Sequence, residues 1–199
     1  MDLSDRWPLP DAQGLRDELV AAYADPQRGY HDHRHLSEVL DRLDELAAAG
    51  TSYDAAPVVL AAWFHDAVYD GERDAEERSA SWAEVALAGL VPAEVVAEVA
   101  RLVRMTESHL PDDGDANGCA LSDADLAILA TPVERYEQYR AAVRQEYAHL
   151  PDEVFGPGRE SVLRNLAEKP HLFHTNYARE HWEGPARANL ERELASMAG

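Results

Sequence analysis

Residues 58–66 read Val-Val-Leu-Ala-Ala-Trp-Phe-His-Asp (VVLAAWFHD), and this stretch decides the fold. Its first seven residues are apolar on every face of a helix, which is typical of a helix buried at the centre of a domain. Asp54 precedes the stretch as an N-cap candidate, and Pro57 suits the first turn. The stretch ends in His65 and Asp66, a polar pair that is costly to bury without partners. The sequence therefore predicts a central helix that carries a histidine and a carboxylate at its end.

Outward from this stretch, apolar residues recur at helical spacing through almost the whole chain. No run shows sustained two-residue alternation, so no sheet is expected. Residues 111–118 (PDDGDANG) predict a loop, and Gly156-Pro157-Gly158 predicts a break. The pattern predicts further helices over about 15–23, 35–49, 74–89, 92–109, 122–130, 132–147, 160–168 and 177–197. These observations favour a single all-α domain.

The composition limits the classes of partner. The 199 residues hold 18 Lys+Arg against 38 Asp+Glu, a formal net charge of -20. Such a charge argues against nucleic acid, whose binders carry a basic face, and against anionic lipid. A small phosphorylated ligand remains compatible, because a metal or a few arginines act locally. One cysteine, Cys119, permits no intrachain disulfide, and no stretch approaches the about 18 apolar residues of a membrane span. The expectation is a cytoplasmic protein with no membrane partner.

Three polar groups stand out on the predicted helices. His31 and His35 lie four residues apart and share a helical face. His65 and Asp66 end the apolar helix, and Asp125 lies among apolar residues of a third helix. The chain is short of cations that would neutralise buried carboxylates, and a divalent metal would satisfy all three groups. The alternative is that these are unrelated capping and surface residues.

The predicted ligand set is His35, His65, Asp66 and Asp125. Mixed imidazole and carboxylate ligands suit Mn, Fe, Co, Ni or Zn. Magnesium is a candidate for a second site.

The pattern His35…His65-Asp66…Asp125 resembles the HD-domain superfamily of metal-dependent phosphohydrolases. Residues 30–39 (YHDHRHLSEV) are similar to a YHNxxHxxxV segment of the cyclic nucleotide phosphodiesterases in that superfamily. The chain as a whole resembles a small bacterial group of predicted HD phosphohydrolases over roughly residues 28–195. The segments that carry this second resemblance are FHDAVYD (64–70), EERSA (76–80), TESH (106–109), DADLAIL (123–129), RQEY (144–147) and Gly158-Arg159.

The resemblance implies one HD-type helical domain over residues 1–199. Residues 1–27 would form an N-terminal helical extension, and residues 170–199 a C-terminal helix packed on the domain. It implies an enzyme that hydrolyses a small phosphate ester or a nucleotide with a metal-activated water. The four predicted ligands match the metal ligands of the superfamily. His31 matches the phosphodiesterase histidine that protonates the leaving oxygen, although Asp32 replaces the asparagine of that motif. A homodimer is left open.

Several other residues are candidates for roles in the site, and an alternative is open for most of them. Asp70 and Asp123 are candidates to orient the nucleophilic water, although Asp70 equally suits a helix-terminal turn and Asp123 competes with Asp125 as the metal ligand. His109 and Glu77 are candidates for a second metal or for phosphate. The arginines that would contact phosphate, with ordinary surface positions as the alternative, are Arg34, Arg78, Arg144 and Arg159.

Two other functions fit the same residues. Some HD proteins carry a di-iron site that activates O₂, and His31 and His109 would be its additional histidine ligands. A non-catalytic nucleotide-binding HD protein is the third reading.

Overall fold

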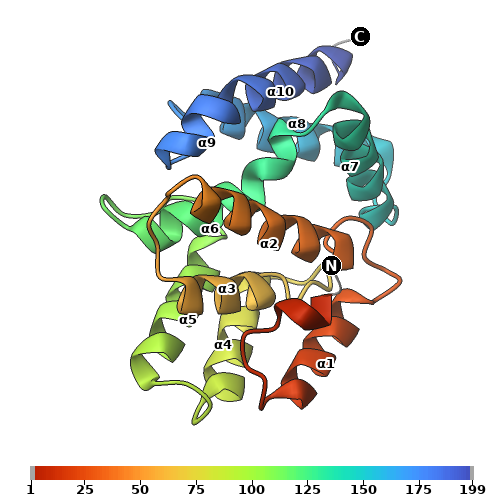
Figure 1. The fold of residues 1–199 in the computed structure, drawn as a ribbon. Helices are drawn as coiled ribbons and strands as arrows, with labels where there is room; N and C mark the ends of the chain where they lie inside the picture. Colours follow the sequence, from red (N-terminus) through yellow and green to blue (C-terminus); the bar gives the residue numbers. More distant parts are fainter. Residues whose placement is uncertain (1–2, 198–199) are drawn as a thin grey trace.

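The computed structural model describes residues 3–197. Residues 1–2 and 198–199, at the outer ends of the expected segments 1–27 and 170–199, lie outside the described part. Within residues 3–197 the chain is all-α, with one isolated bridge between Ala88 and Val91 and no strand (Figure 1). The elements in chain order are η1 (Leu3–Arg6), α1 (Gln13–Tyr23), α2 (His33–Ala48), α3 (Ala55–Phe64), α4 (Ala75–Leu87), α5 (Ala93–Met105), α6 (Ala116–Leu126), η2 (Ala127–Ala130), α7 (Val133–Glu146), α8 (Asp152–Glu168), α9 (Asn176–His181) and α10 (Glu183–Met197).

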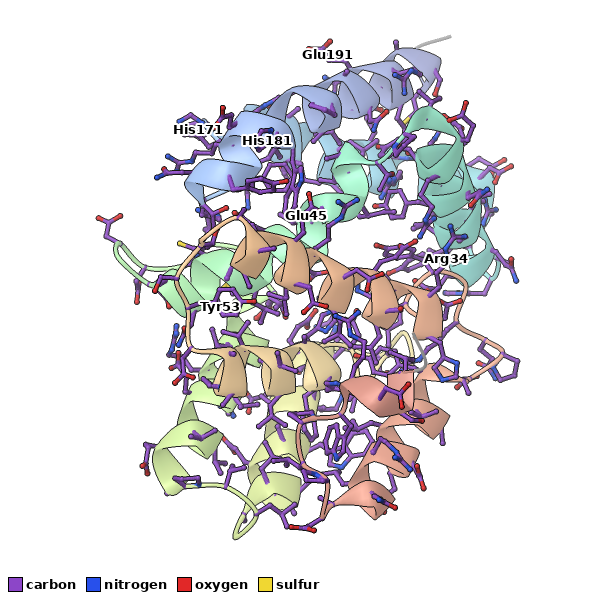
Figure 2. All side chains as sticks on the ribbon, in the orientation of Figure 1. Arg34, Glu45, Tyr53, His171, His181 and Glu191 are labelled. Carbon is purple, nitrogen blue, oxygen red and sulfur yellow. The ribbon has the colours of Figure 1, made fainter. Side chains whose placement is uncertain are left out.

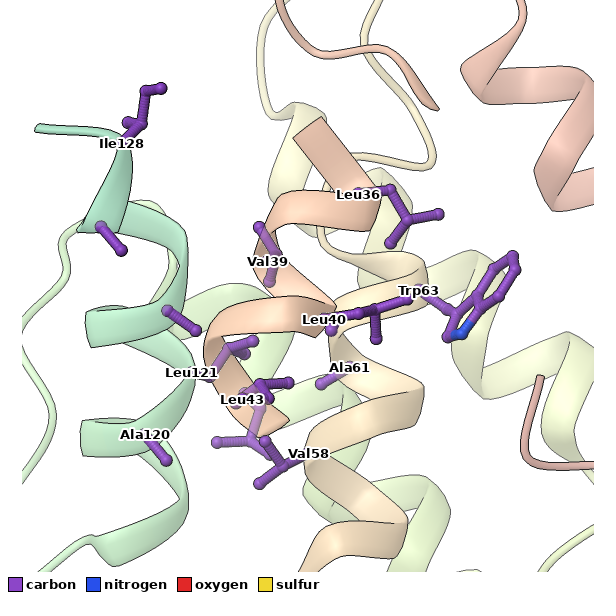
Figure 3. Packing of buried hydrophobic residues seen from close by; sticks show 14 of the residues in the cluster. Leu36, Val39, Leu40, Leu43, Val58, Ala61, Trp63, Ala120, Leu121 and Ile128 are labelled. Atoms are coloured by element: carbon purple, nitrogen blue, oxygen red, sulfur yellow. The ribbon is translucent and has the colours of Figure 1, made fainter. Parts of the chain in front are cut away.

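Helix α3 is the central element that its sequence predicted. It packs against α2, α4, α5 and α6. Asp54 caps it by accepting a hydrogen bond from the Ala56 N–H. Figure 3 shows Leu43 of α2 close to Val58 of α3, while Trp63 of α3 points away from α2. Burial on all sides is what an all-apolar helix requires.

A second group of helices, α7 to α10, lies on the side of α2 opposite α3 (Figure 1). Helix α10 packs on η2, α8 and α9, so η2 joins the two groups. A buried set of polar side chains fastens α7, α8 and α10 together. Arg159 donates to Glu193 at 2.9 and 3.1 Å and to the Tyr139 hydroxyl at 2.9 Å, and the Tyr136 hydroxyl donates to Glu193 at 2.6 Å. We call these four residues the Arg159–Glu193 network.

The break expected at Gly156-Pro157-Gly158 is wrong. Helix α8 runs through all three residues with Pro157 inside it. Pro157 lies in the second turn, where its missing N–H removes one backbone hydrogen bond, and each glycine costs only about 0.5–1 kcal/mol relative to alanine. Burial of Leu163 and Arg159 on the inner face of α8 offsets that cost.

Two other boundaries differ from the sequence expectation. Helix α6 begins at Ala116, inside the expected loop, because the Asp115 carboxylate accepts the Gly118 N–H and caps it. The last predicted helix is two helices that meet at Trp182. The Glu183 carboxylate there accepts the N–H groups of Leu172 and Phe173, which holds the chain before α9 against the start of α10.

None of the helices found between residues 3 and 197 is long and apolar enough to cross a membrane.

Candidate metal centre

The end of α3 sets the direction of His65. After Phe64 the chain leaves the helix, and the Asp66 N–H donates to the Tyr23 hydroxyl at 3.3 Å. The carbonyl of Ala62 lies 2.8 Å from His65 Nδ1, which donates to it. In a neutral ring this bond leaves Nε2 with a free lone pair, the form in which histidine binds a metal.

His35 and Asp125 arrive from two other helices. His35 lies in the first turn of α2, where the Asp32 carboxylate caps the helix by accepting the N–H groups of Arg34 and His35. Asp125 lies in the last turn of α6. Helices α2 and α6 pack against each other, and both pack against α3, so the three side chains meet where the three helices converge.

The Nε2 atoms of His35 and His65 lie 3.0 Å apart. Asp66 Oδ2 lies 3.1 Å from each of them, and the ligand atoms of these three residues all lie within 4.8 Å of one another. Asp125 Oδ1 is 3.3 Å from His35 Nε2 and 3.7 Å from His65 Nε2. His35, His65 and Asp66 are therefore placed to hold a metal ion, with Asp125 beside them. We call the four residues the histidine–carboxylate cluster.

The two carboxylates of this cluster need positive charge beside them. Burial lowers the pKa of both histidines, but Asp125 and Asp66 outweigh it, raising the pKa of His35 to about 9 and that of His65 well above its ordinary value. The pKa values of Asp66 and Asp125 are lowered despite their burial, chiefly by His65. No arginine or lysine among residues 3–197 forms an ion pair with either carboxylate. Protons on the imidazoles or a bound divalent ion would supply the missing positive charge, and mixed N and O donors suit the predicted transition metals.

Beside the cluster, His31 is held by a residue that sequence reasoning missed, Glu146. One oxygen of Glu146 accepts the backbone N–H groups of Gly29, Tyr30 and His31 at 3.0–3.1 Å, and the other lies 2.7 Å from His31 Nδ1. Burial opposes ionisation of Glu146, but the contacts with His31 and the backbone lower its pKa to about 2. The His31 ring also stacks on Tyr69, with centroids 3.9 Å apart. Its orientation is therefore fixed on two sides.

Arg28 is a second residue that the sequence did not reveal. Its buried guanidinium donates to the carbonyl oxygens of His31, Asp66 and Ala67 at 2.8–2.9 Å. Arg28 thus joins the segment that carries His31 to the turn that carries Asp66. Three carbonyl acceptors on two segments fix their separation.

His109 reaches the edge of the cluster. It follows α5 in a left-handed backbone conformation (φ 51°), with Nδ1 3.2 Å from the Ser122 hydroxyl and Nε2 3.6 Å from Asp125 Oδ2. Burial lowers its pKa, which favours a neutral ring. Glu77, the other candidate for a second metal or for phosphate, is exposed and pairs with Arg104 on α5 at 2.5 Å.

The two aspartates of α6 have different surroundings. Asp123 is fully buried and accepts the N–H groups of His174 and Thr175, both at 2.7 Å, while burial raises its pKa to about 6. Residues two apart on a helix point in different directions, so only Asp125 faces the histidines. Asp123 instead fixes the segment before α9.

Asp70 does not join the cluster. Its exposed carboxylate is bound by both terminal nitrogens of Arg78 at 2.6 and 2.7 Å, which holds the pKa of Asp70 well below its usual range. The turn after α3 thus uses Asp70 as a surface ion-pair partner.

The four arginines expected at phosphate each have a carboxylate partner. Their pairs are Arg34–Glu38, Arg78–Asp70, Arg144–Asp152 and Arg159–Glu193. Figure 2 shows Arg34 at the end of α2 next to α7, where it also donates to Gln138. Arg144 additionally holds the carbonyl oxygens of Tyr147 and Leu150. Of the four, only Arg159 is buried.

A cavity of about 770 Å³ opens over the cluster. Its lining includes His31, Asp66, His109 and Asp125, together with side chains of α7 and α8, Arg159 among them. A smaller cavity of about 450 Å³ reaches His35 and Asp125 from the side of α2 that carries Arg34. The larger cavity gives a small molecule access to the cluster.

Comparison of the chain with protein-family models, with curated proteins and with solved structures finds no match.

Proposed function

We propose that this protein is a metal-dependent phosphohydrolase of the HD-domain type that acts on a small phosphate ester, nucleotides included. The observation that carries the proposal is the geometry of the cluster. The two imidazole Nε2 atoms lie 3.0 Å apart, one oxygen of Asp66 lies 3.1 Å from each of them, and Asp66 lines the large cavity. That is a donor set for one cation, placed where a substrate can reach it.

His35, His65, Asp66 and Asp125 would hold the ion, and Mn, Fe, Co, Ni or Zn fits them. A bound ion of this kind lowers the pKa of a coordinated water and polarises a P–O bond. The formal net charge of -20 does not oppose an anionic substrate there, because the cation is not part of the sequence count.

His31 is the residue we assign to protonation of the leaving oxygen. Its Nδ1 is engaged by Glu146, so Nε2 is the ring nitrogen available to the cavity that His31 lines. The Glu146 carboxylate fixes the direction of the ring, and an imidazole at this place is a suitable general acid for a leaving oxygen. Glu146 is a positioning residue in this proposal, because it acts through His31.

The test is release of inorganic phosphate from a panel of nucleotides and sugar and alkyl phosphates, with Mn, Co, Ni, Zn or Mg added to metal-free protein. We expect release that depends on the metal and is abolished by Asp66→Asn. His31→Asn is expected to keep the metal and to lose the acid-catalysed rate. Oxygen consumption by iron-loaded protein without phosphate release would contradict the proposal and favour the di-iron alternative. Nucleotide binding without turnover with any metal would contradict it as well.

A further inference from the structure

We infer that the substrate of this site is a phosphate monoester of an apolar alcohol, with its single phosphate at the metal end of the large cavity and its hydrocarbon part between α7 and α8. The inference rests on the proposed function and names the substrate class.

The side of the cavity formed by α7, α8 and the segment between them, which we call the apolar half, is lined mainly by apolar side chains. Its wall includes Val143 of α7 and Phe155 of α8, with Leu150 from the segment between these helices. Val154 and Val162 also line the cavity and are 55% and 51% exposed. An apolar occupant would remove these surfaces from water at a gain of roughly 25 cal/mol per Å².

The two tyrosine hydroxyls on this side of the cavity, those of Tyr139 and Tyr147, already have one partner each. The hydroxyls of Tyr69 and Tyr147 bond to each other at 3.1 Å, and the Tyr139 hydroxyl accepts from Arg159. A sugar or another polyol would lose its hydration here and find few partners besides Asn165, and unpaired buried polar groups are costly. The apolar half therefore selects against polar bodies.

The positive charges that line the cavity fit one phosphate. Arg159 is neutralised by Glu193, and Glu76 and Glu107 add negative charge to the lining. Lys169 is different, since its Nζ donates only to the carbonyl oxygens of Ser108 and His109 at 3.2 and 3.3 Å, and it forms no ion pair with a carboxylate among residues 3–197. Its charge lies at the His109 edge of the cluster. A second or third phosphate would have to lie against the two glutamates or in the apolar half.

The inference is tested with matched ligands on the metal-loaded protein. n-Hexyl phosphate and glycerol 3-phosphate have similar primary leaving groups. A difference between their KM values therefore reflects binding in the cavity and not the reactivity of the ester. We expect a KM for hexyl phosphate at least 10-fold lower than for glycerol 3-phosphate, since each buried CH₂ contributes about fourfold. Calorimetric titration with n-hexylphosphonate and methylphosphonate gives the same comparison without turnover. We expect n-hexylphosphonate to bind at least 10-fold more tightly than methylphosphonate.

Variants separate the two ends of the cavity. Val154→Asp is expected to weaken n-hexylphosphonate at least fivefold and methylphosphonate much less, whereas Lys169→Gln should weaken both equally. Val85→Asp is the matched control, since Val85 is 79% exposed on α4 away from the cavity and should change neither.

Equal binding of the two phosphonates, or a lower KM for nucleoside triphosphates than for hexyl phosphate, would overturn the inference. If glycerol 3-phosphate is hydrolysed as well as hexyl phosphate, the proposed function stands and the inference fails. If no ester is hydrolysed but the hexyl compound still binds 10-fold tighter, the cavity assignment stands and the proposed function fails.

Discussion

The protein buries two charged networks, and they are completed in different ways. The Arg159–Glu193 network brings its own cation, and Arg159 and Tyr136 keep the pKa of Glu193 low despite burial. The histidine–carboxylate cluster has no arginine or lysine partner in the part of the chain that the structure describes. Its nitrogens face each other and its carboxylates face the nitrogens. The first network stabilises the fold without help, whereas the second is complete only with protons or a metal.

Metal binding should therefore give a large change in stability. A ligand that binds only the folded state at about 1,000 times its Kd adds about 4 kcal/mol to the free energy of unfolding. We expect that gain when Mn or Zn is added to chelator-treated protein, measured by urea denaturation. A free energy of unfolding that does not respond to any of the candidate metals would show that the cluster is neutralised by protons alone.

Breaking the other network should destabilise the fold without touching the metal. Glu193→Gln leaves the buried Arg159 without its counter-charge, and breaking a buried pair in this way costs about 3–5 kcal/mol. Urea denaturation measures the loss, and elemental analysis of the folded variant should find the wild-type metal content. Loss of metal together with stability would mean that the two networks are coupled.

Glu146 belongs to neither network. Its carboxylate is held by three backbone N–H groups and by His31. Its pKa is about 2 in the folded chain against an ordinary value of 4.5, so the unfolded chain takes up the proton first as the pH falls. The stabilisation is complete above pH 4.5 and disappears as the pH falls toward 2. We expect Glu146→Gln to cost about 2 kcal/mol at pH 7, the scale of a hydrogen bond to a charged group. Denaturation curves at pH 7 and pH 3 should show the gap narrowing, and a gap that widens at pH 3 would contradict this reading.

The surface pairs should give the smallest effects. Asp70→Asn and Glu77→Gln remove exposed partners of Arg78 and Arg104, and exposed ion pairs contribute little. We expect the unfolding midpoint and the metal content of both variants to match wild type. A loss of metal in Asp70→Asn would contradict the surface role of Asp70 and show that it contributes to the cluster.

Some of these features follow from local sequence patterns, and others depend on contacts between distant parts of the chain. The central helix was predictable because the apolar run in α3 leaves no polar face. The meeting of His35, His65 and Asp66 was predictable because polar groups in apolar helices need partners. Asp123 and Asp125 could not be separated, since two residues on one helix differ only in what their faces meet. Glu146 stands in the RQEY segment (144–147), but its role was missed because its partners lie 115 to 117 residues away in the chain.

Helix boundaries depend on similar distant contacts. Gly156-Pro157-Gly158 has the local signature of a break, but the packing of Arg159 against Glu193, 34 residues away, helps to hold α8 continuous. The partners of the arginines were also hidden from the sequence. A phosphate role was expected of four of them, and only the fold reveals that each one has a carboxylate partner: Arg34, Arg78, Arg144 and Arg159.

The most direct test of the account is the metal affinity of one matched pair of variants. Metal-free wild type, Asp66→Asn and Asp70→Asn are titrated with Mn or Zn by calorimetry at constant pH. The two substitutions are chemically identical and lie four residues apart, one in the cluster and one on the surface. We predict that Asp70→Asn binds like wild type and that Asp66→Asn loses affinity by at least about 100-fold, beyond what outer-shell partners typically cost. Equal affinity in all three proteins would contradict the central claim.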